Sequence, residues 1–182
     1  ERKIDKALER KGLLSKYQGH NPHCIIESID RVNSDLEKSQ YFFSDIKKEG
    51  ITLYDSGEFK LSEPKELNEE KRIEIAKADY EHWIVKADGF LKHTVLGMEI
   101  DLNLSAFHLH QATESFYNCA LLTLSGYKPK SHDLEELNQL CAIQSNDFLK
   151  TFPLATDEQK ECFKLLQKAY IDARYNKNFR IT

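Results

Sequence analysis

No stretch of the 182-residue sequence approaches the roughly 20 consecutive apolar residues that span a bilayer. The first residues, ERKIDKALERKG, lack the apolar segment of a secretory signal peptide. Hydrophobic residues make up 40% of the chain and charged residues 31%, a balance that is typical of folded proteins rather than disordered ones. These features predict a cytoplasmic protein that does not associate with membranes.

Cysteine motifs and excess positive charge are also missing. Cys24, Cys119, Cys141 and Cys162 show no CxxC spacing, and two of them lie inside apolar helical patterns. We therefore expect buried free thiols, with disulfides or metal ligation as the alternatives. The formal net charge is −4. Because general duplex-DNA binders gain affinity by neutralising phosphates, this charge argues against that class and leaves room only for a local basic patch.

The histidines do not form a recognisable catalytic or metal-binding motif, and no Ser–His–Asp order or nucleophile elbow is present. His108 and His110 are two residues apart on a predicted helix, so they point about 200° apart and cannot share a metal. The segment HNPHC at 20–24 lacks a fourth zinc ligand. His132 is interpreted as a structural hydrogen bonder rather than a catalyst.

The first third of the chain mixes helical and strand patterns. The expected elements are a helix at 2–17, strands at 23–29 and 51–57, and two helical turns within 32–50. The segment 56–68 is polar and contains Pro64, which predicts a linker. We therefore expect a small α/β remnant at 1–62, followed by a helical part at 63–182.

Beyond the linker, apolar residues recur at spacings of three and four, as in amphipathic helices. In the first helix this stripe consists of Ile73, Ala76, Tyr80, Trp83, Ala87, Phe90 and Thr94. Asn68, Ser131 and Thr156 are the expected N-caps, and Gly97 and Gly126 are the expected ends of the first two helices. The expected helices are 69–97, 102–125, 132–145 and 157–176. This pattern predicts a mainly α fold, an up-and-down bundle of four to five helices.

A narrow polar line runs along the second helix. His110, Glu114 and Asn118 lie at i, i+4 and i+8, with Gln111 beside them, whereas Phe116 lies on the apolar side. The line is either a thin solvated edge, or a groove or subunit interface in which polar groups meet a partner. In a dry interface an unpaired carboxylate would cost several kcal/mol, so Glu114 would then need a cation.

The last helix offers such a cation. Arg174 lies one turn after Tyr170, and a guanidinium can fork onto a carboxylate or a phosphate. The segment RYNKNFR at 174–180 alternates cations with aromatic residues, including Tyr175, which suits a phosphate and a stacked base. The alternative is a solvated, fraying helix end.

The segment AFHLHQATESFYNCALLTLSGYKPKSHDLEEL, followed by AYIDARY, closely resembles the HEPN family. The likeness covers about residues 70–182. Its most specific pieces are His-Gln-x-x-Glu at 110–114, Lys-x-His-Asp-Leu at 130–134 and Ala-Arg-Tyr at 173–175. The resemblance implies a helical, nucleotide- or RNA-associated domain that pairs as a homodimer.

The preceding segment, VNSDLEKSQYFFSDIKKEGITLYDSGEF, resembles the tail of a minimal nucleotidyltransferase domain. Such enzymes use a Gly-Ser turn and paired aspartates to hold Mg²⁺ and a nucleoside triphosphate. The sequence contains neither a Gly-Ser dipeptide nor an Asp-x-Asp motif. We therefore expect the chain to begin after the catalytic elements of such a domain, to hold no cofactor and to have no transferase activity, with ATP or another nucleotide as a candidate ligand.

Many HEPN ribonucleases carry an Arg, four to six residues, and then a His. If Arg174 is that Arg, the corresponding positions hold Phe179, Arg180 and Ile181 instead of the His that would act as general acid or base. The first hypothesis is therefore a non-catalytic module that binds a nucleotide or RNA in a dimer groove, with Glu114 positioning Arg174. The alternatives are a ribonuclease of the toxin–antitoxin type that uses Arg174 with His110, and a purely structural dimerisation module.

Overall fold

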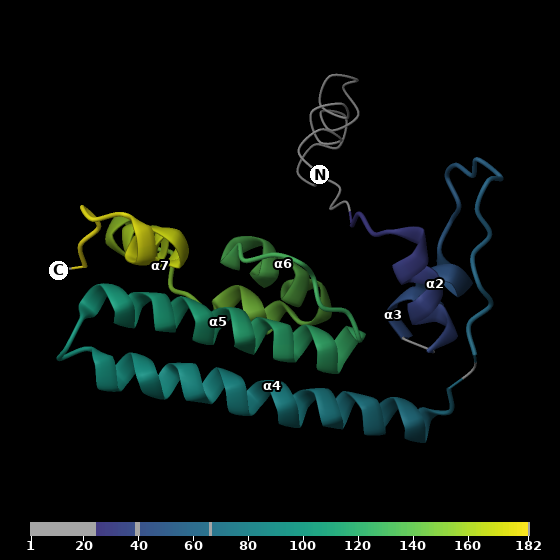
Figure 1. Ribbon diagram of the computed structural model, residues 1–182, viewed down its shortest axis with the longest axis horizontal. Coiled ribbons are helices and arrows are strands. Elements are labelled where there is room, and N and C mark those ends of the chain that lie inside the picture. Colours follow the sequence, from purple (N-terminus) through teal and green to yellow (C-terminus); the bar gives the residue numbers. More distant parts are fainter. Residues whose placement is uncertain (1–24, 39–40, 66, 182) are drawn as a thin grey trace.

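The computed structural model describes residues 25–38, 41–65 and 67–181. The described residues contain helices and no strand (Figure 1), which confirms the mainly α class. The helices are α2 (Ile29–Glu37), α3 (Tyr41–Glu49), α4 (Glu69–Gly97), α5 (Leu102–Ser125), α6 (Leu134–Gln144), the 3₁₀ helix η1 (Asn146–Lys150) and α7 (Asp157–Tyr175).

The long helices α4 and α5 form an antiparallel hairpin, and their ends follow the predicted signals. Asn68 caps α4, because its side-chain oxygen accepts a hydrogen bond from the Lys71 N–H. Gly97 ends α4 where this helix approaches α5 closely, since a Cβ atom at Gly97 would lie 2.7 Å from Ser105 Oγ. Gly126 ends α5 with φ of 64°, the left-handed conformation that favours glycine.

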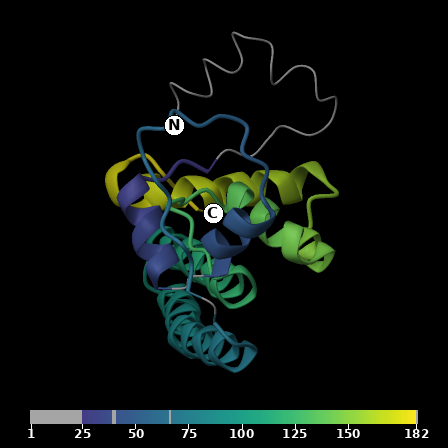
Figure 2. The same ribbon diagram turned by 90° about the vertical axis from the view of Figure 1, so that its right-hand side faces the viewer.

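Helix α5 forms the middle layer of the helical part. It packs against α4 on one side and against α6 and α7 on the other. Figures 1 and 2 show that α7 crosses α5 steeply instead of running beside it. The hydrophobic core lies between α5, α6 and α7 and contains Tyr117, Leu121, Leu134, Leu137, Leu140, Cys141 and Leu166. None of the helices in the described ranges is both long and apolar enough to cross a membrane.

The caps of the last two helices differ in how well they were predicted. Thr156 and Gln159 form a complete capping box at the start of α7, as expected. Helix α6, however, begins two residues later than predicted and is capped by Asp133 rather than Ser131. The Asp133 carboxylate accepts hydrogen bonds from two N–H groups of the first turn, whereas the Ser131 hydroxyl accepts from the Asp133 N–H one step earlier.

The two predicted strands are wrong in the described residues. Ser28 caps α2, so the chain enters a helix where the first strand was expected to end. Residues 51–57 have an irregular backbone and exposed side chains, because no neighbouring strand pairs with them in the described part. The predicted helix at 2–17 and the HNPHC segment at 20–24 lie outside the described residues.

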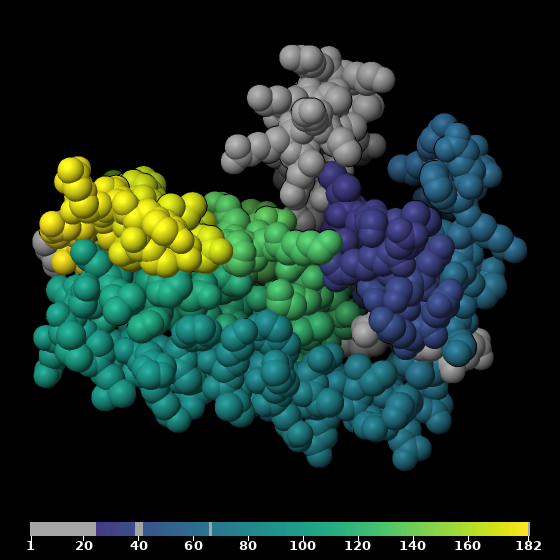
Figure 3. All heavy atoms as spheres, viewed as in Figure 1, coloured from purple at the N-terminus to yellow at the C-terminus, as the bar shows by residue number. Residues whose placement is uncertain are grey.

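Helices α2 and α3 pack on the loop that follows α5. Leu36, Phe43 and Tyr127 form a small buried cluster. Figure 3 shows the two helices against the atoms of the α5–α6 region. Arg72, near the start of α4, adds an ion pair to Asp45 of α3 at 3.1 Å.

Several residues that were predicted to be buried are exposed. Phe116 of α5 is 37% exposed, and Ile73 and Tyr80 of α4 are also exposed, because one side of the α4–α5 layer has no covering element in the described chain. Cys119 and Cys141 are buried free thiols as predicted, but Cys162 is exposed on α7.

Candidate functional site at the crossing of α5 and α7

The polar line of α5 is buried. His110 is 0% exposed, Asn118 is similarly buried, and the Glu114 side chain is only 12% exposed. Burial excludes the explanation of this line as a solvated helix edge. The carboxylate of Glu114 therefore needs donors from the protein.

Glu114 receives those donors from its own helix and from the α5–α6 loop. Gln111 Nε2 donates to Glu114 Oε2 at 3.1 Å. His132 Nδ1 lies 3.0 Å from the same oxygen and donates to it when Nδ1 carries the proton. The ion pair that was expected between Glu114 and Arg174 is not formed, because the loop places His132 against the carboxylate instead.

Tyr170 joins the two histidines of the site. The His132 ring stacks on the Tyr170 ring with centroids 4.4 Å apart, and the His110 ring stacks on it at 5.1 Å. His110 is sealed from solvent, whereas the His132 side chain is 55% exposed. Of the two imidazoles, only His132 can meet a molecule that arrives from solution.

Arg174 lies one turn further along α7 and is surrounded by aromatic rings. Its guanidinium carbon is 4.7 Å from the centroid of Tyr170, 4.9 Å from that of Phe107 and 5.0 Å from that of Tyr175. Its Nε donates to the backbone oxygen of Tyr170 at 2.8 Å, which fixes the side chain in place. Arg174 is exposed, and no carboxylate among the described residues pairs with it.

The loop between α5 and α6 positions His132 through its contacts with α7. Gln167 accepts a hydrogen bond from the Leu134 N–H with Oε1 and donates from Nε2 to Asp133, both at 2.9 Å. One α7 side chain therefore holds the end of the loop one helical turn before Tyr170. This arrangement brings His132 over the Tyr170 ring.

The two ends of the polar line each contain a buried, unsatisfied atom. His110 Nε2 and Asn118 Oδ1 are buried and have no hydrogen-bond partner in the described chain. Burial lowers the pKa of His110, while the nearby Glu114 carboxylate acts in the opposite direction. The imidazole is therefore held in its neutral form inside the fold.

The structure thus groups most of the predicted site residues but not all of them. His110, Gln111, Glu114, Tyr170 and Arg174 meet at the helix crossing, with the exposed Tyr175 at its edge. Asn118 lies one turn beyond Glu114, and its buried Oδ1 has no hydrogen-bond partner in the described chain. The interpretation of His132 as a hydrogen bonder agrees with its contact to Glu114, whereas its stacking on Tyr170 and the place of Phe107 beside Arg174 were not predicted.

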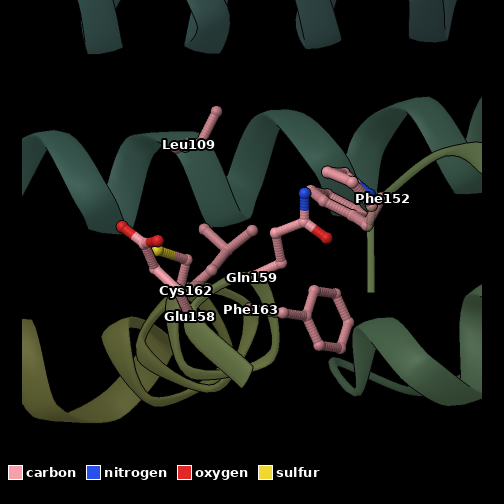
Figure 4. A pocket seen from close by; sticks show the side chains of 8 residues that line it. Leu109, Phe152, Glu158, Gln159, Cys162 and Phe163 are labelled. Carbon is pink, nitrogen blue, oxygen red and sulfur yellow. The ribbon is translucent and has the colours of Figure 1, made fainter. Parts of the chain in front are cut away.

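A separate apolar hollow of about 360 Å³ lies between α5 and the first half of α7 (Figure 4). Leu109, Phe152, Cys162 and Phe163 are among its walls, and neither Glu114 nor Arg174 lines it. Glu114 and Arg174 therefore lie outside this hollow. Within the described ranges, no group of three or more His, Cys, Asp or Glu side chains is arranged to hold a metal ion.

The lowered pKa of His110 predicts a loss of stability in mild acid. The unfolded chain takes up a proton near the ordinary imidazole pKa of about 6.5, whereas the folded chain resists protonation to a lower pH. The free energy of unfolding should therefore decrease as the pH falls below that value. Urea titrations between pH 7.5 and 5 should show a smaller decrease for His110→Gln than for the wild type.

The matched control is His82→Gln, because His82 is exposed on α4. It should retain the full pH dependence of the wild type. An equally steep loss of stability in His110→Gln would contradict a neutral, buried His110.

The comparison with known families identifies the domain that contains this crossing. The HEPN domain matches residues 80–181, which include the second half of α4, the complete crossing of α5 with α7, and the loop that carries His132. A search among curated proteins found no relative that matches the chain. Because the matched segment covers more than half of the sequence, the chain belongs to the HEPN domain family.

Proposed function

We propose that this chain is a nucleotide- or RNA-binding HEPN module in which Arg174 binds phosphate. The observation that carries the proposal is an exposed guanidinium that is fixed in place but has no carboxylate partner among the described residues. A planar guanidinium whose remaining N–H donors face solvent suits the oxygens of a phosphate group. The binding role requires no catalytic group.

The rings around Arg174 suit the other half of a nucleotide. Tyr175 is 75% exposed, and its ring lies 5.0 Å from the guanidinium, so a base could stack on its free face. Lys177 and Arg180 follow shortly after the end of α7 and add positive charge. Within the described residues, the Arg180 guanidinium donates to the backbone oxygens of Lys177 and Phe179, and these contacts do not neutralise its charge.

In the complete protein, this module would support a nucleotidyltransferase domain that precedes it. The proposal is supported by the likeness of the residues before α4 to the tail of such a domain. ATP or another nucleotide would then be a ligand common to both parts.

Replacing Arg174 should weaken binding strongly, because the phosphate loses its bidentate, charged donor. Isothermal titration calorimetry with ATP and with a short single-stranded RNA should show at least about tenfold weaker binding for Arg174→Ala. Arg174→Lys should give an intermediate affinity, since an ammonium keeps the charge but not the fork.

Arg72→Ala is the matched control, because it removes an arginine whose charge is paired with Asp45. It should bind both probes as the wild type does. Unchanged affinity of Arg174→Ala for a probe that the wild type binds would contradict the proposal.

A second candidate function, ribonuclease activity, is favoured by the contact between His132 and Glu114. His110 cannot act on an external substrate because it is sealed from solvent, but His132 is half-exposed and its Nδ1 is oriented by a carboxylate. Its Nε2 could take the proton of a ribose 2′-hydroxyl. The 2′-oxygen would bond to phosphorus, and the 5′-oxygen would leave and take a proton from water.

Cleavage of a labelled single-stranded RNA on denaturing gels tests this candidate. His132→Ala should reduce the rate by about a hundredfold or more, as expected for the loss of a general base. Cleavage that persists unchanged in His132→Ala would contradict this mechanism, and no cleavage by the wild type would leave the binding module as the function.

We further propose that the chain forms homodimers through the uncovered side of the α4–α5 layer. Ile73, Tyr80 and Leu91 follow one line along α4, and Phe116 and Leu124 are exposed on α5. Ile73 and Leu124 line the same hollow, which places the two stripes on one side of the layer. Leu109, two turns before Phe116, continues this apolar side into the hollow of Figure 4.

Phe116→Glu should convert the dimer into a monomer, because it places a charge in the centre of the apolar face. Light scattering coupled to size exclusion would show the mass halved. Val85→Glu is the control, since Val85 is exposed but lies about a third of a turn away from this stripe.

A Phe116→Glu variant that remains dimeric would contradict this interface. A stable dimer that binds neither ATP nor RNA would instead favour the purely structural role.

A further inference from the structure

We infer that helices α2 and α3, with the residues that lead into them, hold the loop that carries His132, so that Glu27, Lys130 and Phe42 are positioning residues for the site. This inference rests on the proposed function, because it assigns His132 to the ligand-binding surface. It extends beyond the HEPN domain itself, since the family match begins at residue 80.

The first attachment is aromatic and lies at the start of the loop. Tyr127 directly follows the Gly126 that ends α5, and it is almost completely buried. Its ring stacks on Phe42 of α3 with centroids 4.2 Å apart and meets the edge of Phe43 at 6.2 Å. Burial of these rings fixes the start of the loop to α3.

The second attachment is an ion pair in the middle of the loop. The Glu27 side chain, just before α2, is only 4% exposed. One carboxylate oxygen accepts from Arg31 at 2.9 Å, and the other accepts from Lys130, also at 2.9 Å. Because a buried carboxylate needs donors, Glu27 holds the Lys130 ammonium, although the Lys130 side chain is itself 70% exposed.

The third attachment is the one to α7, where Gln167 binds Asp133 and the Leu134 N–H. Only Ser131 and His132 therefore lie between two fixed points, Lys130 and Asp133. The Ser131 hydroxyl accepts a hydrogen bond from the Asp133 N–H, which tightens this short span further. A displacement of the Lys130 backbone reaches His132 across a span of only two residues.

The consequence is a mechanical connection between the segment before the HEPN match and the ligand surface. If α2 and α3 shift, Glu27 and Phe42 move Lys130 and Tyr127, and His132 changes its place over Tyr170. The domain upstream can thereby alter the site without touching the ligand.

Two variants of the complete chain test this inference, Glu27→Gln and Lys130→Ala. The direct measurement is the imidazole Cε1–H signal of His132 in a two-dimensional NMR spectrum, assigned with His132→Gln. Both variants should shift this signal, and both should weaken ATP binding by about fivefold, a typical size for coupling between sites. Lys130→Arg should restore the wild-type signal and affinity, because arginine can keep the ion pair.

The matched control is Lys128→Ala. Lys128 belongs to the same loop, but its ammonium lies over the Trp83 ring of α4, 5.4 Å from the centroid, instead of contacting α2. It should leave the His132 signal in place. Thermal unfolding of each variant shows whether a shifted His132 signal reflects a displaced imidazole or a loss of the fold.

An unchanged His132 signal in both Glu27→Gln and Lys130→Ala would overturn the inference, whatever the affinity for ATP. If the His132 signal shifts in both variants but the wild-type chain binds neither ATP nor RNA, the positioning role is upheld and the proposed function is rejected. The two failures are therefore distinguishable.

Discussion

A carboxylate that is largely removed from water needs donors close by, and Glu114 finds them in Gln111 and His132. This requirement ties the middle of α5 to the loop between α5 and α6. The loop in turn brings the His132 ring onto Tyr170, and Tyr170 carries Arg174 one turn later on the same helix. The position of the exposed cation thus depends on how one buried charge is satisfied.

The same arrangement explains why Arg174 remains available for a ligand. Had Glu114 paired with Arg174, the two charges would have neutralised each other and the surface would have little attraction for phosphate. Because His132 pairs with the carboxylate, the contacts of the guanidinium in the described part of the chain are a backbone oxygen and three aromatic rings. These contacts orient the cation without cancelling its charge.

The helical part could be predicted from the sequence because its signals are local. Asn68, Gly126 and Thr156 act within one turn of the residues that they cap, and the structure confirms all three. The prediction of a strand at 51–57 is wrong for the opposite reason, since a strand needs a pairing partner that no local pattern reveals. Phe116 is exposed although the helical pattern places it on an apolar side, because that pattern does not show whether another element covers the side.

The sequence indicates which residues meet at the helix crossing, but it does not show which of them pair with each other. His110, Glu114, Tyr170 and Arg174 were selected from helical spacing, which shows which residues share a face of one helix. Spacing does not show which residue of a distant loop enters between two helices, and so the partners of His132, Glu114 and Tyr170, could not be predicted. Its placement depends on Gln167, Lys130 and Tyr127, and these contacts join segments far apart in the sequence.

The central claim is that the surface around Arg174 and Tyr170 binds a nucleotide or RNA. Photo-crosslinking with 8-azido-ATP and with RNA that contains 4-thiouridine, followed by mass spectrometry of the peptides, tests it most directly. The account predicts crosslinks within the peptide that contains Tyr170 and Tyr175, with competition by unmodified ligand. Crosslinks confined to another part of the chain, such as the exposed side of α4, would contradict it.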